Sequence, residues 1–328
     1  MASKTVTFHA NATSIPSVDL IQNTLAKTES ILYSITASVA IILNTIYIAL
    51  MTCCRGRRSE DNSVSILAVS LSIANFLSAC SIFYIYSMLL VGREIHVLQN
   101  IFLICCGATW QYSILTGMSL DRYLAILKPL HYHQLVNKTR VATATIISGV
   151  MSITLTCPLL VLPINFDQVG NNSVQTSNLT MSDILSSEME YFFMAWSVLQ
   201  TLFIIIISAL SIPVILVIRK QLKKNDRNGG GSIKGTVMIL IVILYSVITI
   251  IPLLFLFSLP SIREMPVLER KPLDMFCSIM LYSNGIVNPF LCGLASKRVW
   301  QNVCKKKVDV DIATSLSSRV SDECNATM

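Results

Sequence analysis

The chain has 328 residues, of which 53% are apolar and only 13% are charged. Soluble domains are about 25% charged, so too few charges remain here to cover a water-soluble globule of this size. A disordered chain would be poor in apolar residues, and 12 Gly, 10 Pro and 10 Cys exclude collagen-like, low-complexity and disulfide-dense classes. The composition therefore indicates an integral membrane protein.

The spacing of the charged residues predicts seven membrane-spanning helices. Seven stretches of 22 to 31 residues carry no charge, whereas no other stretch exceeds 15 residues. About 20 apolar residues cross a hydrocarbon core of about 30 Å as a helix. Long apolar runs lack the alternation of a transmembrane β-barrel, and buried helices of a soluble protein would not give seven stretches of spanning length. The expected spans are residues 31–53, 63–91, 96–120, 141–164, 191–218, 235–259 and 275–295.

Lysine and arginine are distributed unequally between the two sides of the membrane. With the N-terminus outside, 19 of these residues are cytoplasmic and 6 are extracellular. The positive-inside rule therefore predicts a multi-pass plasma-membrane protein with its N-terminus outside. This asymmetry explains the net charge of +7 without a nucleic-acid partner, and it places basic residues near anionic lipid. The first residues contain no apolar segment, so we expect no cleaved signal peptide.

Sequons fall on both predicted sides. Asn11, Asn171 and Asn178 open N-x-S/T triplets on the predicted outside and are the expected glycosylation sites. Asn137 and Asn325 open the same triplet on the predicted cytoplasmic side, where no glycosylation is expected.

The predicted spans are nearly free of ionisable residues. Pumps, ion transporters and voltage sensors carry acids, bases or arginine rows at membrane depth. No metal-ligand cluster, phosphate-binding loop or pairing of nucleophile and base can be assembled from these spans. We therefore expect no enzyme activity, no cofactor and no metal, and the remaining expectation is a conformational switch.

Two motifs lie in the third and seventh spans. The inner end of the third span contains Asp121-Arg122-Tyr123, which is followed by the loop Lys128–Tyr132, and the seventh span contains Asn284–Phe290. These motifs resemble the Asp-Arg-Tyr and Asn-Pro-x-x-Tyr motifs of rhodopsin-like (class A) G protein-coupled receptors, and the resemblance covers the whole chain. The loop is also similar to the second inner loop of vertebrate odorant receptors.

This resemblance implies a fold, a set of partners and a set of switch residues. The fold is an all-α integral membrane protein, a seven-transmembrane helix bundle with a short amphipathic cytoplasmic helix. The implied partners are a heterotrimeric G protein, an unknown ligand and the lipid bilayer, with arrestin at the Ser/Thr-containing tail. The implied coupling and switch residues are Asp121, Arg122, Tyr123, Pro129, Pro252, Asn288 and Pro289, and the implied polar core residues are Asn44, Asn75 and Asn284.

Each motif also has a direct physical interpretation. Arg122 is a permanent cation at the end of a span and can pair with Asp121. Pro289 removes a backbone hydrogen bond, and Asn284 and Asn288 are expected to satisfy the freed groups. The structural alternatives are a boundary charge, an ordinary membrane proline kink and asparagines that only join helices.

The chain divides into four segments around the bundle. Residues 1–30 form the expected extracellular N-terminus, 31–295 the bundle, 296–307 an amphipathic helix on the membrane surface and 308–328 the cytoplasmic tail. Cys304 lies on the apolar face of the surface helix and is a candidate for palmitoylation, and an unmodified thiol is the alternative.

Several positions depart from the pattern of the family. Asn75 stands where the family has the Asp of a sodium site, Cys292 replaces the Tyr of the seventh-span motif, and Ile250 replaces a Trp in the sixth span. The fourth span contains no Trp, and no Cys is placed to form the outer disulfide common in the family. We expect sodium binding to be lost, because Asn supplies no carboxylate.

The sequence restricts the ligand but does not identify it. Ile104 stands where amine receptors carry Asp, which disfavours an amine anchored in that way, and the seventh span lacks the lysine that would hold retinal. The candidate pocket residues are Ile104, Tyr112, Phe255 and Tyr282, for which helix packing is the structural alternative. The expected function is a cell-surface receptor for an extracellular ligand. The alternatives are an odorant or other chemosensory receptor of the same fold, a seven-helix scaffold that does not signal, and a transporter or channel.

Overall fold

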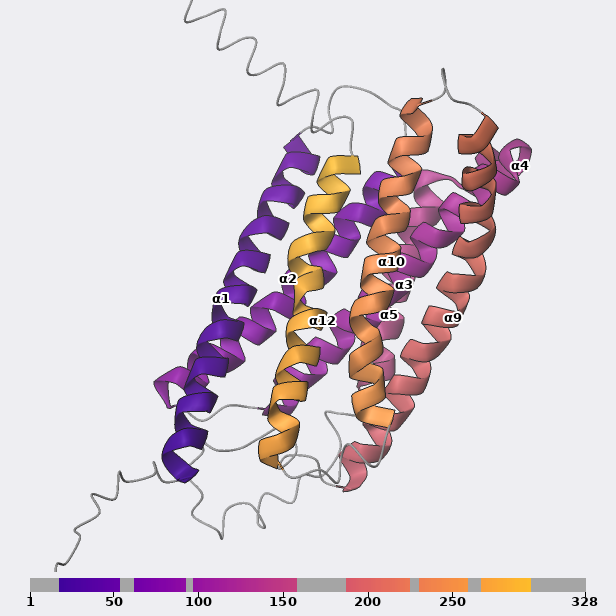
Figure 1. Cartoon of the computed structure of the whole chain (residues 1–328). Coiled ribbons are helices and arrows are strands. Elements are labelled where there is room, and N and C mark those ends of the chain that lie inside the picture. Colours follow the sequence, from indigo (N-terminus) through magenta and orange to yellow (C-terminus); the bar gives the residue numbers. More distant parts are fainter. Residues whose placement is uncertain are drawn as a thin grey trace, which may run out of the picture.

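The computed structural model describes residues 18–53, 62–92, 97–157, 187–224, 230–258 and 267–295, and all regular structure in these ranges is helical (Figure 1). The helices are α1 (Val18–Cys53), α2 (Asn62–Val91), α3 (Val97–Leu127), α4 (Pro129–Leu135), α5 (Lys138–Thr156), α9 (Ser187–Lys224), α10 (Gly230–Ser258) and α12 (Val267–Ala295). The N-terminal residues 1–17, the predicted surface helix 296–307, the tail 308–328, Asn11, Asn171, Asn178 and Cys304 lie outside the described residues.

Each of the seven predicted spans coincides with one long helix, which confirms the predicted all-α seven-helix bundle. Six of these helices are long and apolar enough to cross a membrane. The exception is α5, with 19 residues, because residues 158–164 of the predicted fourth span lie outside the described ranges.

Several helices are longer than the charge-free stretches that predicted them. For example, α9 runs from Ser187 to Lys224, whereas the charges predicted a span over 191–218. A charged side chain does not prevent the backbone hydrogen bonds of a helix, so missing charges mark the part in the hydrocarbon core rather than the helix ends. Helix α4 was not predicted, and it begins with Pro129, whose missing N–H costs nothing at the first position of a helix.

The bundle is organised around α3, which contacts α2, α4, α5, α9 and α10. Helix α1 packs against α2 and α12, and α10 packs against α9 and α12. Figure 1 shows the long helices side by side, with α4 at the end of the bundle where α3 terminates. We refer to this end as the α4 end.

Apolar side chains occupy both the interior and the outer face of the bundle. Leu115, Val242 and Ile250 are completely buried in a core shared by six of the helices. On the outer faces, Val198 of α9 and Ile146 of α5 are 61% and 66% exposed. Such a large apolar surface would be unstable in water and matches the hydrocarbon core of a bilayer.

Two glycines allow helices to approach closely around the centre of the bundle. A Cβ atom at Gly107 of α3 would overlap the Ser78 hydroxyl of α2, and a Cβ atom at Gly285 of α12 would lie 3.2 Å from the Ala40 Cβ of α1. These contacts hold α1, α2, α3 and α12 together around the cavity described below.

The fourth span contains no Trp, and a Trp of the neighbouring helix α3 packs against it instead. Trp110 of α3 lies over Gly149 of α5, where an added Cβ would be 3.3 Å from the indole ring. The indole Nε1 donates to the Thr145 carbonyl at 3.3 Å. The aromatic contact between these two helices is therefore supplied from α3.

Candidate functional site

A cluster of polar side chains at the α4 end surrounds Asp121 and Arg122. The Arg122 guanidinium donates from Nε and Nη2 to Asp121 Oδ2, at 2.9 and 2.5 Å, so the pair expected from their adjacency is present. The Asp121 side chain is only 4% exposed and that of Arg122 is 17% exposed. Charge-assisted hydrogen bonds of this kind are about twice as strong as neutral ones, so Asp121 fixes the guanidinium firmly.

The second oxygen of Asp121 is held by α4. The Tyr132 hydroxyl donates to Asp121 Oδ1 at 2.9 Å, and the Ser63 hydroxyl at the start of α2 lies 3.1 Å from the Tyr132 hydroxyl. Burial, together with the nearby Asp121 carboxylate, raises the pKa of the Tyr132 phenol above its ordinary value of 10.0. The phenol therefore keeps its proton at neutral pH and acts as a donor to Asp121.

The family motif did not predict the roles of Tyr132 and Ser63. Tyr132 was part of the loop that indicated a relationship to odorant receptors, but only folding returns its hydroxyl to an aspartate 11 residues earlier. Pro129 is the first residue of the helix that carries Tyr132. Tyr123, which follows Arg122 in the sequence, is half-buried.

The seventh-span motif leaves one backbone carbonyl of α12 without a helical donor, and α1 supplies that donor. Pro289 has no N–H, so the Gly285 carbonyl four residues earlier lacks its helical donor. Asn44 of α1, completely buried, donates from Nδ2 to that carbonyl at 2.7 Å. The expectation that Asn284 and Asn288 satisfy this group is wrong, because both asparagines form hydrogen bonds with α10 instead.

The bonds made by Asn284, Asn288 and Tyr112 join three helices. Asn284 Nδ2 donates to Thr249 Oγ1 at 2.6 Å, and the Ser246 hydroxyl donates to Asn288 Oδ1 at 3.2 Å. The Tyr112 hydroxyl of α3 donates to the Ser246 carbonyl at 3.0 Å. These contacts connect α3, α10 and α12 one to two turns before Pro252 of α10, so relative movement of α10 must break buried hydrogen bonds.

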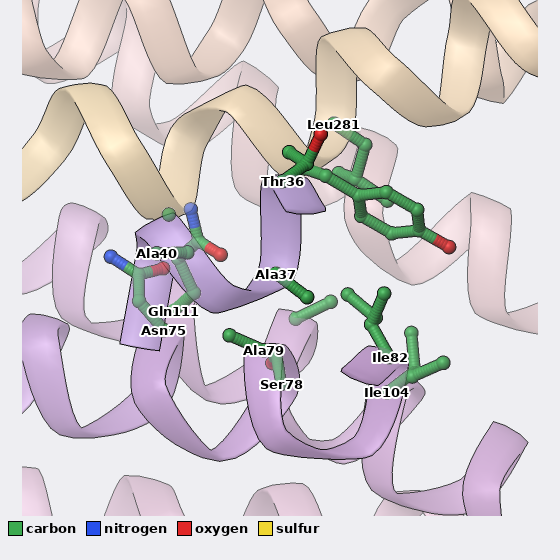
Figure 2. A pocket seen from close by; sticks show the side chains of 13 residues that line it. Thr36, Ala37, Ala40, Asn75, Ser78, Ala79, Ile82, Ile104, Gln111 and Leu281 are labelled. Atoms are coloured by element: carbon green, nitrogen blue, oxygen red, sulfur yellow. The ribbon is translucent and has the colours of Figure 1, made fainter. Parts of the chain in front are cut away.

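A cavity of about 40 Å³ lies between α1, α2, α3 and α12. Ile104 and Tyr282 line it, together with Asn75. Figure 2 shows Asn75 and Gln111 near one end of the cavity and Ile82 and Ile104 near the other. The lining is therefore mostly apolar, and its two amides lie near one end. Gln111 was not among the predicted core residues, although a neutral amide within an apolar span was a signal for it.

Two predicted pocket residues lie elsewhere. Phe255 is 57% exposed on the outer face of α10, where it faces the surroundings of the bundle. Tyr112 is completely buried, and its hydroxyl is bonded to α10. Neither residue lines the cavity, because apolar and aromatic residue types do not reveal which side of a helix faces inward when both sides are apolar.

The described cysteines are all free thiols. They are Cys53, Cys80, Cys105, Cys106, Cys157, Cys277 and Cys292. Among the residues that the structure describes, no group of His, Cys, Asp and Glu could hold a metal ion.

Comparison with known proteins places this geometry in a family. Residues 44–291 match the family described as "7 transmembrane receptor (rhodopsin family)". The chain is 30% identical to human Olfactory receptor 6C3 over 223 residues, which is 64% of this chain and 68% of the relative. It is 27% identical to human Olfactory receptor 6C75 over 241 residues, or 69% of this chain and 73% of the relative.

The matched region contains the Asp121-Arg122-Tyr123 cluster, the Asn288-Pro289 motif and the part of the cavity lining that comes from α2, α3 and α12. Proteins of this family are membrane receptors and not enzymes, in agreement with the lack of a catalytic arrangement in the sequence. The chain belongs to the rhodopsin-like family of seven-transmembrane receptors, as a divergent member that resembles the olfactory receptors.

Proposed function

We propose that the chain is a chemosensory G protein-coupled receptor that passes the binding of a small extracellular molecule to a heterotrimeric G protein. The observation that carries this proposal is the cluster at the α4 end, where Asp121 binds both Arg122 and Tyr132. A half-buried guanidinium held by one buried acid is a group that can be released to a partner protein when the helices move.

The proposed orientation has the N-terminus outside and the α4 end in the cytosol. The unequal distribution of 19 and 6 basic residues supports it. In this orientation Arg122, Tyr123 and α4 face the G protein, and the cavity between α1, α2, α3 and α12 lies further toward the outside than this cluster.

The energetic requirement is that the ligand bind two arrangements of the bundle with different affinity. The contacts of Asn284, Asn288 and Tyr112 hold α10 against α3 and α12 in the described arrangement. Movement of α10 breaks these bonds, each worth about 0.5–1.5 kcal/mol. A G protein that supplies acceptors for Arg122 offsets that cost in the active arrangement.

The chemosensory assignment rests on the resemblance to olfactory receptors and on the chemistry of the cavity. The cavity carries no charged lining residue, which suits a small uncharged molecule better than an amine or an acid. Arrestin binding to the tail, glycosylation of Asn11, Asn171 and Asn178 and palmitoylation of Cys304 are further proposals, on residues outside the described ranges.

The test is a screen of the full-length chain in cells against small uncharged odorants, with dissociation of G protein subunits as the readout. The decisive variant is Arg122→Ala, which should abolish the response at unchanged surface expression. The matched control is Arg140→Ala, because Arg140 lies at the same end but is exposed and donates to the Gln134 carbonyl.

The outcomes separate the alternatives. Equal responses of the parent and Arg122→Ala contradict the proposed role of the cluster. A parent chain that reaches the surface and activates no G protein supports the non-signalling scaffold, and uptake or conductance in the same cells supports a transporter or channel.

A further inference from the structure

Three buried polar atoms on residues that line the cavity have no hydrogen-bond partner among the residues that the structure describes. They are Asn75 Nδ2, Ser78 Oγ and Gln111 Nε2, from α2 and α3. Asn75 is 3% exposed and Gln111 is 5% exposed, so bulk solvent does not supply the missing partners. The three atoms come from neighbouring helices whose close approach at Gly107 presses Ser78 against α3.

Leaving such groups unpaired is costly. A buried donor without a partner loses its hydration without compensation, and the large majority of buried polar groups in native proteins are paired with protein or ordered water. A cavity needs a volume of about 10–15 Å³ for each water molecule that it holds. The cavity of about 40 Å³ therefore has room for about three water molecules. Both the size and the lining of the cavity therefore call for a small polar occupant.

A sodium ion, which the family resemblance implies near position 75, does not fit these residues. Two of the three unpartnered atoms, on Asn75 and Gln111, are amide N–H donors, which repel a cation. None of the lining residues is an acid, so no negative charge compensates the loss of the ion's hydration. Turning either amide around would present a carbonyl oxygen but would add no charge.

We propose that this cavity binds a neutral hydrogen-bond-accepting oxygen, carried by water or by the polar end of a small uncharged molecule, and does not bind sodium. The unpartnered groups on Asn75, Ser78 and Gln111 are the groups available to bond such an oxygen, and the apolar part of the lining, including Ile82 and Ile104, accommodates any hydrocarbon attached to it. This inference concerns occupancy of the cavity and does not depend on signalling.

The first test measures the thermal midpoint Tm of the purified full-length chain in lipid nanodiscs. Gln111→Leu removes one donor and keeps an apolar side chain of similar length. If the donor has an oxygen partner, the variant loses that bond and its Tm falls below that of the parent. If the cavity is dry, removing an unpaired buried donor raises Tm, which overturns the proposal.

A second variant and a control keep the test decisive. Ser78→Ala is a smaller change that should lower Tm for the same reason, and it decides the question if Gln111→Leu fails to fold. Gln200→Leu is the control for the same substitution at a buried glutamine outside the cavity. Gln200 is completely buried, donates to Thr109 Oγ1 at 3.1 Å and does not line the cavity.

The sodium part of the proposal is tested on the unmodified chain. Its Tm should be equal in sodium chloride and choline chloride at the same ionic strength. A rise in Tm that only sodium produces would overturn the proposal.

The two sources of the oxygen are distinguished with a matched pair of probes. Acetone and isobutene have the same branched shape, but isobutene carries a CH2 group in place of the carbonyl oxygen of acetone. A higher Tm with acetone than with isobutene, present in the parent and in Gln200→Leu and absent in Gln111→Leu, identifies the organic source. No difference between the probes, combined with a lower Tm of Gln111→Leu and Ser78→Ala, identifies water. A higher Tm of Ser78→Ala than of the parent in both probes overturns the proposal.

Discussion

The Asn44 side chain on α1 donates to the Gly285 carbonyl on α12 at 2.7 Å, which is the carbonyl that Pro289 deprives of its helical donor. The proline therefore does not simply weaken α12. It creates an acceptor that only a neighbouring helix can satisfy, and Asn44 also donates to its own helix at the Ala40 carbonyl at 2.7 Å. This amide joins the first and last helices of the bundle, as does the Tyr33 hydroxyl of α1, which donates to the Met275 carbonyl of α12 at 3.4 Å.

This relationship predicts a coupled pair of substitutions. Asn44→Ala should destabilise the protein by about 1–3 kcal/mol, because the buried Gly285 carbonyl loses its donor. In the Pro289→Ala background, an N–H at position 289 restores the helical bond, so Asn44→Ala should cost clearly less. Thermal unfolding of the four proteins in detergent measures the coupling.

Thr45→Ala is the control for that cycle, since Thr45 is exposed and its hydroxyl bonds only to the Ile41 carbonyl of its own helix. It should change stability by less than Asn44→Ala. Equal costs of Asn44→Ala with and without Pro289 would show that the amide does not serve the carbonyl.

Tyr132→Phe should loosen α4 from the bundle. The phenol contributes a hydrogen bond to a carboxylate, worth about 1.5–3 kcal/mol, and this bond joins α4 to Asp121. Amide hydrogen exchange of residues 129–135 should accelerate by at least about tenfold, the factor that 1.4 kcal/mol represents. Tyr84→Phe, at a 41% exposed position on α2, should leave that exchange unchanged.

Glycosylation tests the proposed orientation. Asn171 and Asn178 should carry glycans in cells, and Asn137 should not. The Asn137 side chain accepts a hydrogen bond from the Thr139 N–H as the N-cap of α5, near the end of the bundle that carries α4. Mass spectrometry before and after glycosidase treatment gives the occupied sites, and a glycan on Asn137 would reverse the orientation.

A membrane-impermeant reductant should leave the protein unaffected. The seven described cysteines are free thiols, and the sequence between the fourth and fifth spans contains no Cys for an outer disulfide. Surface level and ligand response should therefore match those of untreated cells. Loss of response at constant surface level would mean that a cysteine is placed wrongly in the proposed orientation and forms an outer disulfide.

The sequence alone determined the class of the fold and the location of the motifs. Seven charge-free stretches define seven helices because a charge at membrane depth is costly whatever the tertiary packing. The adjacency of Asp121 and Arg122 was sufficient to predict their pairing, since neighbours in sequence need no long-range contact to meet.

The tertiary structure decided which side chain meets which group on another helix. The sequence showed that Pro289 frees a backbone carbonyl, but it predicted Asn284 and Asn288 as the donors to it. The donor is Asn44, which is 241 residues from Gly285. It also could not place Tyr132 on Asp121, or separate Phe255 on the outer face from Ile104 in the cavity. In a membrane protein both faces of a helix are apolar, so the hydrophobic pattern that orients helices in soluble proteins is weak, and only packing fixes their rotation.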